Sequence, residues 1–220
     1  MSGSEDLWGN YSLADVWVVS GPVQKKAHSS ILFTSSVVLQ EELKKRIRWD
    51  EKPWKITIKI KNPPDQEDTT PPEIDEGSLE RFLYFMYHRR IADWGSSATT
   101  LLRLGYTYKM EELMVLCEDQ FLEKLSAGNA VACLILANAC DRHALKRKVA
   151  DYISTNMDSV MVSKNWKKLE SNLKLLGEIL VTTPSDRRKR QTINEKILDA
   201  PVTWEVDTRE SKFTNKSCQY

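Results

Sequence analysis

Three side chains that could bind a metal ion or take part in redox chemistry lie close together in the sequence: Cys133, Cys140 and His143. The first two belong to "AVACLILANAC", residues 130–140, a stretch without any charged residue. A structural zinc site needs four ligands, usually in two closely spaced pairs, and only Cys140 and His143 have such spacing. The remaining cysteines and histidines are isolated: Cys117, Cys218, His28 and His88. The sequence therefore predicts neither a metal site nor a cofactor.

The same apolar stretch is better explained as part of a packed core. It is much shorter than the about 20 apolar residues of a membrane-spanning helix, and charged residues follow it from Asp141 onward. The start of the chain, "MSGSEDLWGNYS", has no basic and apolar signal segment, so no disulfide framework is expected for the four cysteines. Buried cysteine behaves as a small hydrophobic side chain. We therefore expect the cysteines to pack in the core of an intracellular, water-soluble protein.

Motifs and charge argue against an enzyme and against a polyanionic partner. The sequence has no glycine-rich phosphate loop, no H-E-x-x-H and no G-x-S-x-G, and its three histidines are far apart. Its 32 basic and 31 acidic residues leave a net charge of +1, too little to attract nucleic acid or an anionic membrane. We therefore expect a protein that is not an enzyme and has no nucleic-acid or membrane partner.

Amphipathic helices are predicted around the apolar stretch. Ser126 can cap a helix that contains it, and "HALKRKVADYIST", residues 143–155, predicts a second helix that completes a hairpin. Helical spacing also predicts a helix before this hairpin and a third helix after it. The positions with helical spacing are Leu113, Cys117, Phe121, Leu125, Val131, Leu134, Ile135, Asn138, Leu145, Val149, Tyr152, Ile153, Trp166, Leu169, Leu173, Leu176 and Leu180. From about residue 78 onward the sequence predicts a run of short helices.

The first quarter of the chain predicts strands and two short helices. "DVWVVSGPVQKKAH", residues 15–28, indicates two strands joined by a Ser-Gly-Pro turn, and residues 29–47 indicate the two helices. In "WKITIKIKN", residues 54–62, apolar residues alternate with polar ones, as in a strand with one buried face. Residues 62–77 contain four prolines and six acidic residues, which predicts an exposed loop. The predicted fold class is therefore α+β.

Three segments together resemble the BTB/POZ family. "LADVWVVSGPVQKKAHSSILFTSS" has its aspartate, strand hairpin, Ala-His and Ile-Leu pair, and "SLERFLYFMYHRRI" is similar to a later helix of that fold. "YTYKMEELMVLCEDQFLEKLSAGNAVACLILANACDRHALKRKVADYISTN" resembles the end of a speckle-type POZ protein and the helical box that follows. The resemblance implies a short sheet flanked by helices. It divides the chain into a BTB/POZ domain at 7–125 with the loop 62–77 inserted, three-box or BACK-like helices at 126–180 and a polar tail at 181–220.

The resemblance implies a protein–protein interaction module. Speckle-type POZ proteins suggest a substrate adaptor or regulatory subunit of a cullin-3 ubiquitin ligase, although they carry a MATH domain for which this chain has no room. A non-ligase BTB scaffold, transcriptional or cytoskeletal, would share every fold feature, so this alternative stays open. The implied partners are the cullin-3 scaffold, a second copy or a longer BTB paralogue, and an unknown substrate. The basic run at 187–190 could be a nuclear address, so the nucleus, the cytoplasm or both are expected.

The resemblance also implies residues that contact the cullin. The family uses an apolar-x-Glu element after its second helix, which Trp49 and Glu51 could supply, although Trp49 could instead cover the edge of the sheet. We expect the cullin-contact residues to face solvent. The candidates are Leu43, Ile47, Trp49 and Glu51.

A second set of residues is implied for dimerisation. The candidates are Leu7, Trp8, Asp15, His28 and Ile31. His28 is the expected partner of Asp15, unless this acid caps a turn locally. Since little of the family's first dimer helix is matched, we expect a weak homodimer or a preference for a longer paralogue.

Overall fold

The computed structural model describes residues 5–49, 52–61 and 73–170, and beyond these 172, 175–177 and 179. The chain divides into two compact units, Met1–Thr183 and Pro184–Tyr220, and all the described residues belong to the first unit. The predicted polar tail, its basic run and the larger part of the predicted loop therefore lie outside the described residues. Within the described part, no helix has the length and apolar character needed to span a membrane.

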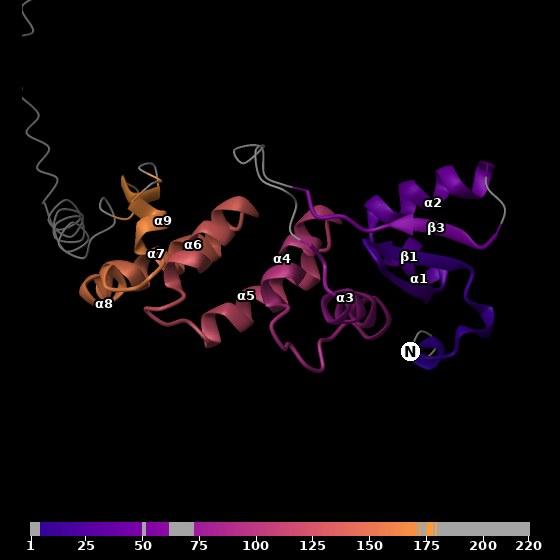
Figure 1. Cartoon of the computed structure of the whole chain (residues 1–220), viewed down its shortest axis with the longest axis horizontal. Helices are drawn as coiled ribbons and strands as arrows, with labels where there is room; N and C mark the ends of the chain where they lie inside the picture. The colour runs from indigo at the N-terminus through magenta and orange to yellow at the C-terminus, as the bar shows by residue number, and fades with distance from the viewer. Residues whose placement is uncertain are drawn as a thin grey trace, which may run out of the picture. The chain divides into compact units, whose positions relative to one another are not determined.

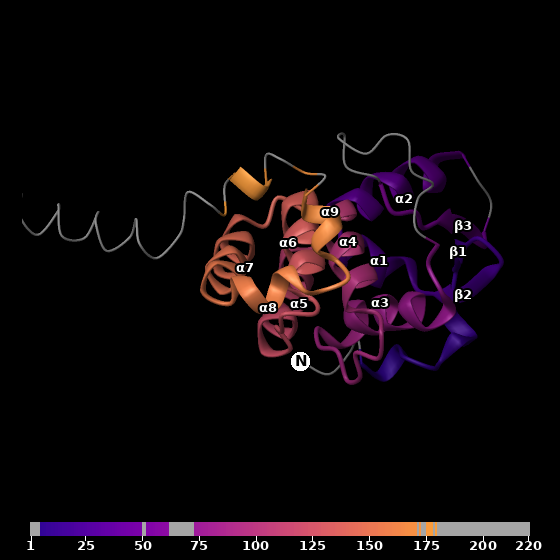
Figure 2. The same ribbon diagram turned by 60° about the vertical axis from the view of Figure 1, so that its left-hand side comes forward.

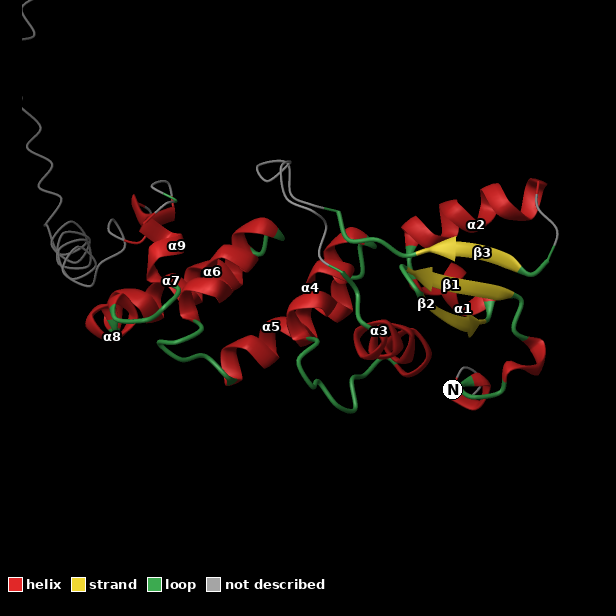
Figure 3. Cartoon of the chain, viewed as in Figure 1, coloured by secondary structure: helices red, strands yellow, loops and turns green. Residues whose placement is uncertain are grey.

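Three short strands form one mixed sheet, drawn in yellow in Figure 3. β1 (Val16–Ser20) is central, with β2 (Val23–Ala27) antiparallel on one side and β3 (Trp54–Thr57) parallel on the other. Gly21 has a φ of +54° between β1 and β2, a left-handed conformation that a residue without Cβ adopts easily in a tight turn. The predicted hairpin is confirmed.

The predicted alternation around β3 is confirmed and extends past the strand. The buried positions are Trp54, Ile56, Ile58 and Ile60, and the exposed ones are Lys55, Thr57, Lys59 and Lys61. The Ile58 N–H still donates to the Val19 carbonyl of β1 at 2.7 Å, and beyond Ile58 side-chain hydroxyls take over as partners of the backbone. The Lys59 N–H donates to the Tyr108 hydroxyl at 3.0 Å, and the Lys61 N–H donates to the Thr107 hydroxyl at 3.3 Å.

Helices precede the sheet in the sequence and cover its inner face. Two 3-10 helices, η1 (Glu5–Leu7) and η2 (Tyr11–Leu13), precede β1, and the later helices up to residue 125 are α1 (Ser29–Ser35), α2 (Val37–Trp49), α3 (Glu76–His88), α4 (Ala98–Thr107) and α5 (Glu111–Glu123). The second helix has 13 residues, more than predicted. The prediction of an exposed loop is wrong from Ile74 onward, because Ile74 is buried and Asp75 caps α3 by accepting the Ser78 N–H at 2.9 Å.

The last part of the described chain is helical, as predicted. Its helices are α6 (Ala130–Ala139), α7 (His143–Thr155), α8 (Met157–Met161) and α9 (Trp166–Glu170). The predicted hairpin corresponds to α6 and α7, in which Leu134 and Leu145 are fully buried. The predicted Ser126 cap is wrong: Asn129 occupies the cap position, and its Oδ1 accepts the Ser126 N–H. The short helix α8 was not predicted, and Leu173 and Leu180 lie outside the described residues.

One continuous apolar core links these elements. In Figures 1 and 2, α3, α4 and α5 lie between the sheet with α1 and α2 on one side and α6–α9 on the other. Buried side chains from every region join the same cluster, among them Val18, Phe82, Leu104, Leu134 and Leu169. The helices after residue 125 therefore share a core with the rest of the unit.

The cysteines belong to this core. Cys117, Cys133 and Cys140 are buried and have free thiols, which confirms the packing prediction for these three, whereas Cys218 lies outside the described residues. Burial raises the pKa of the Cys133 thiol to about 12 and that of Cys140 to about 11, so both stay protonated at neutral pH. Over the described ranges, no three His, Cys, Asp or Glu side chains gather as metal ligands would.

Candidate interaction surfaces

Three of the predicted cullin-contact residues, Leu43, Ile47 and Trp49, belong to the C-terminal half of α2. Leu43 has no exposed surface, so the expectation that it faces solvent is wrong. Its spacing of four residues from Leu39, which is also buried, places both on the core-facing stripe of the helix. The side chains of Ile47 and Trp49, and Glu51 as a whole, lie outside the described residues.

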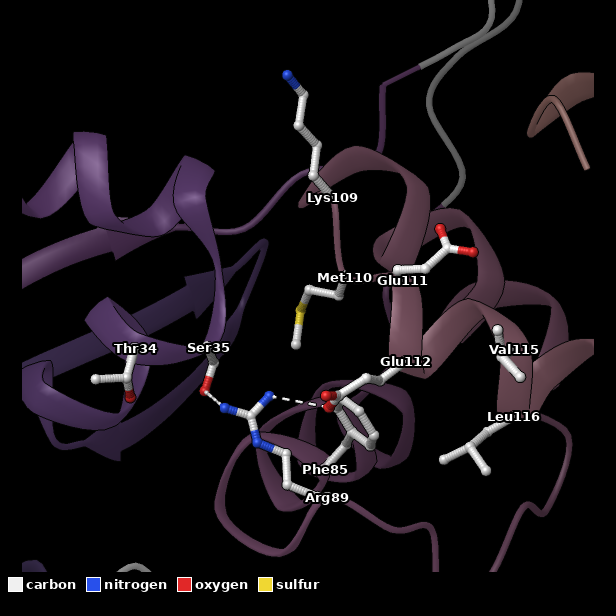
Figure 4. Close-up of a pocket in the computed structure, with 10 residues that line it drawn as sticks. All are labelled: Thr34, Ser35, Phe85, Arg89, Lys109, Met110, Glu111, Glu112, Val115 and Leu116. Carbon is white, nitrogen blue, oxygen red and sulfur yellow. Dashed lines mark hydrogen bonds and ion pairs between the residues drawn. The ribbon is translucent and has the colours of Figure 1, made fainter.

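A groove of about 880 Å³ opens between α1, α3 and α5, and none of the predicted cullin-contact residues is among the described residues that line it. Its lining residues are Thr34, Ser35, Phe85, Arg89, Lys109, Met110, Glu111, Glu112, Val115 and Leu116. Figure 4 shows α1 on one side of it, the α5 residues on the other, and Met110 pointing inward while Lys109 extends away. The Arg89 guanidinium links the two sides, because it donates to the Ser35 hydroxyl at 3.4 Å and lies 3.5 Å from the Glu112 carboxylate.

The groove combines apolar surface with a charged rim. Val115 and the half-buried Leu116 supply its accessible apolar surface. The buried Phe85 and Met110 lie beneath, and charged side chains of both signs lie around it. Val115 is 44% exposed at the edge of the groove. Protein interfaces have this composition, an apolar centre within a polar rim. The groove is thus suited to receive apolar side chains of another protein segment.

A set of hydrogen bonds fixes the walls of this groove. The Ser36 hydroxyl donates to the Tyr108 carbonyl at 2.6 Å and accepts the Leu39 N–H at 3.3 Å, so it caps α2 and ties it to the α4–α5 connection. On the other side, a Cβ at Gly105 would lie 2.8 Å from the Met114 side chain. The residue at this position in α4 must therefore be small for α5 to approach so closely.

An aromatic cluster holds the dimer candidate Trp8. Its ring meets the rings of Tyr84, Tyr87 and His88 edge-on, with centroids 5.2–5.8 Å apart. Leu7 packs partly buried against the core beside it. The N-terminal segment therefore contacts α3 of its own chain.

The dimer candidates Asp15 and His28 do not pair with each other, so that expectation is wrong. Asp15 accepts the Ser29 N–H at 2.7 Å and the Ser29 hydroxyl at 2.8 Å, and it forms an ion pair with Lys52 at 2.8 Å. Burial raises the pKa of Asp15, but the hydrogen bonds from Lys52 and Ser29 outweigh it and hold the pKa below its ordinary value. The donor and cation for Asp15 are thus Ser29 and Lys52, 14 and 37 residues away along the chain, so the alternative of a local turn cap does not describe Asp15 either.

His28 and Ile31 are both buried, and His28 has a different partner. The His28 ring Nδ1 lies 2.8 Å from the Tyr87 hydroxyl, which also accepts the His28 backbone N–H at 3.0 Å. The ring Nε2 has no hydrogen-bond partner. A role of these residues in a dimer stays a prediction.

A group of charges joins α4 and α5 to the turn between α6 and α7. Arg142 forms two hydrogen bonds with the Glu111 carboxylate, at 2.8 and 2.9 Å, and a further ion pair with Glu118. The Tyr106 hydroxyl donates to Asp141 in the same turn at 2.9 Å. The hydrogen bonds from Arg142 lower the pKa of Glu111. Because Glu111 also lines the groove, this group positions part of the groove wall.

Sequence reasoning missed the groove and this charge group. Both join residues that are far apart along the chain, and spacing within one helix gives no sign of such pairs. Val115 does interrupt the polar side of "EELMVLCEDQ", but a single exposed apolar residue is common on protein surfaces and does not by itself indicate a contact surface.

The fold and the groove are typical of a protein that binds other proteins. A small sheet flanked by helices carries an open groove with apolar surface and a charged rim, which is suited to such binding. A family model for the BTB/POZ domain matches residues 5–125, more than half of the 220 residues. The chain belongs to the BTB/POZ family, whose domain is a protein–protein interaction module.

Known relatives carry the same domain. The chain is 27% identical over 173 residues to the mouse protein "TD and POZ domain-containing protein 5", covering 78% of this chain and 47% of the relative. It is also 27% identical over 180 residues to "TD and POZ domain-containing protein 1-like" of mouse, covering 79% and 44%. "TD and POZ domain-containing protein 4" of mouse is 25% identical over 190 residues, covering 83% and 46%. The chain thus spans less than half the length of these relatives.

Proposed function

We propose that the chain acts as a substrate adaptor or regulatory subunit of a cullin-3 ubiquitin ligase. The observation that carries this proposal is the groove between α1, α3 and α5, with the exposed Val115 at its side, in a chain of the BTB/POZ family. The resemblance of residues 106–156 to speckle-type POZ proteins supports it. In this view a helix of the cullin N-terminal region lays its apolar side chains in the groove.

The proposed role needs no catalytic residue. Interfaces depend on a few buried anchors surrounded by polar contacts, and the groove offers apolar surface between Arg89 and Glu112 for such anchors. Ile47, Trp49 and Glu51 stay candidates for a further cullin contact through the family resemblance alone. Helices α6–α9 would serve as the three-box or BACK-like support of the same surface, since they share its core.

Calorimetry with the purified cullin-3 N-terminal region tests the proposal. We expect Val115→Asp to weaken binding by at least about tenfold, because a charge would enter an apolar contact, while the melting temperature stays unchanged. The matched control is Val162→Asp, since Val162 is 87% exposed at the end of α8 and does not line the groove. The double variant Trp49→Ala with Glu51→Ala should also lose binding.

Absence of cullin binding by the wild-type protein would rule out the adaptor role. If the wild-type protein does not bind the cullin at about 50 µM, the adaptor role fails. A BTB scaffold that acts without the ligase, transcriptional or cytoskeletal, would then be the function to pursue.

In either role we propose assembly with a second copy or a longer paralogue, and a location in the nucleus, the cytoplasm or both.

A further inference from the structure

The outward face of the sheet carries lysines around one tryptophan, and these lysines form no ion pair within the described part of the chain. In the strand register, Trp17 of β1 lies between Lys26 of β2 and Lys55 of β3. Residues that pair directly point to the same side of a sheet, so these three form a row across it. Along the β3 segment, Lys59 and Lys61 continue the exposed positions beyond Lys55.

These lysines differ from their neighbour in lacking acidic partners. Lys25, on the opposite face of β2, pairs with Glu76 at 2.7 Å and with Glu80 at 3.3 Å. Lys26 instead lies over the Trp17 ring, with its Nζ 5.3 Å from the ring centroid. Lys55, Lys59 and Lys61 form no ion pair with any described residue.

Acidic side chains at the ends of the sheet do not neutralise this face. Asp15 is engaged by Lys52 and Ser29 at one end. Glu73 lies beside Gly21 at the hairpin turn, at the other end. The strand residues of the outward face include no acid: they are Trp17, Val19, Gln24, Lys26, Lys55 and Thr57.

We infer that this face binds an extended acidic peptide segment of a partner protein. Neighbouring strands are about 4.8 Å apart, so Lys26 and Lys55 lie about 10 Å from each other across Trp17. An extended peptide advances about 3.3 Å per residue, so its alternate carboxylates are about 6.6 Å apart. Lys59 and Lys61 are likewise two positions apart along the chain, with Ile60 between them. Alternate acidic side chains along such a segment thus match the spacing of the lysines along the β3 segment.

The geometry favours a peptide over single-stranded nucleic acid. Base stacking needs a free aromatic face, and Lys26 already covers the ring of Trp17. The net charge of +1 also provides no long-range attraction for a polyanion. None of the described residues of this face lines the groove between α1, α3 and α5. The protein could therefore bind an acidic segment on the sheet while another partner binds in the groove.

Fluorescence anisotropy with a labelled peptide of alternating glutamate and threonine tests the inference on the full chain. We expect binding that weakens as salt is added, since exposed charge pairs are screened beyond about 10 Å at 0.1 M salt. Lys55→Glu with Lys59→Glu should weaken binding by about tenfold or more, because each substitution replaces an attraction with a repulsion. The matched control is Arg147→Glu with Lys148→Glu on α7, two exposed positions with the same change in charge.

The control variant and the neutral peptide show whether binding depends on this face of the sheet. The control pair should change the affinity by less than about twofold, and a peptide of alternating glutamine and threonine should not bind. Equal losses in both double variants would overturn the inference, because binding would then follow net charge alone. Absence of binding by the wild-type chain, or tighter binding of oligouridylate than of the acidic peptide, would overturn it as well. Circular dichroism melts establish that each variant is folded.

Discussion

At the scale of single residues, Asp15 joins the sheet to the first helix. Its carboxylate accepts two hydrogen bonds from Ser29, the first residue of α1. It also forms an ion pair with Lys52, which precedes β3. A carboxylate at the start of a helix satisfies an N–H group that has no partner within the helix. The contact with Lys52 is more exposed, so the hydrogen bonds to Ser29 provide most of the stabilisation.

Replacing this acid should lower stability measurably. We expect Asp15→Ala to reduce the free energy of unfolding by about 1–2 kcal/mol, because α1 loses its cap. Lys52→Ala, which removes only the ion pair, should cost less than about 1 kcal/mol. Urea unfolding monitored by circular dichroism measures both, and equal losses in the two variants would contradict the assignment.

The same residue predicts a dependence on pH. The pKa of Asp15 in the folded protein is lower than its ordinary value of 3.8. Its contribution to stability is therefore complete above the unfolded-state pKa and is lost as the pH falls through the lower folded-state pKa. Wild type should lose more stability than Asp15→Asn between pH 5 and pH 2.5, by urea unfolding at each pH. Parallel curves for the two proteins would contradict this expectation.

At the scale of elements, α6 shows how completely the helices after residue 125 belong to the core. Leu134 has no exposed surface, whereas Ala132 on the same helix is exposed. We expect Leu134→Asp to destabilise the protein by several kcal/mol, because it places an unpaired charge among apolar side chains. Ala132→Asp is the control and should leave thermal unfolding nearly unchanged. An unaltered melt of Leu134→Asp would contradict the packing of α6.

The turn between α6 and α7 offers a second test at this scale. Arg142→Met would leave the Glu118 carboxylate, which is only 13% exposed, without its cation. We expect a loss of about 1–3 kcal/mol, since removing one partner of a partly buried pair leaves the other desolvated. Arg147→Met on the exposed side of α7 is the control. A loss no greater than that of the control would show that the pair contributes little.

Elements were predictable from the sequence where one local pattern determined them. The alternation after Trp54 and the helical stripe of Leu145, Val149 and Ile153 are such patterns. The apolar side chains of each pattern are buried, as expected. The expectation that Leu43 faces solvent rested on the family resemblance, whereas its four-residue spacing from the buried Leu39 places it on the core side of α2. The contacts of the groove could not be predicted, because their geometry depends on how distant helices pack.

At the scale of the whole molecule, the N-terminal segment satisfies its aromatic contacts within its own chain. Trp8 packs against Tyr84, Tyr87 and His88 of α3. A segment already held in this way has less to gain from a second copy, so we expect weak self-association. Analytical ultracentrifugation should show mostly monomer at about 1 µM. A tight dimer at nanomolar concentration would contradict this expectation.

The hydrogen bonds from Tyr108 and Thr107 to the chain after β3 have a consequence for dynamics. The amides of Lys59 and Lys61 lie outside the ladder of the sheet, yet side chains at the end of α4 hold both. Their protons are protected from exchange while these two hydrogen bonds hold, and separation of α4 from the sheet would break both at once. Correlated deuterium uptake at the two amides would therefore report such separation, whereas rotation of one hydroxyl side chain would release only one amide.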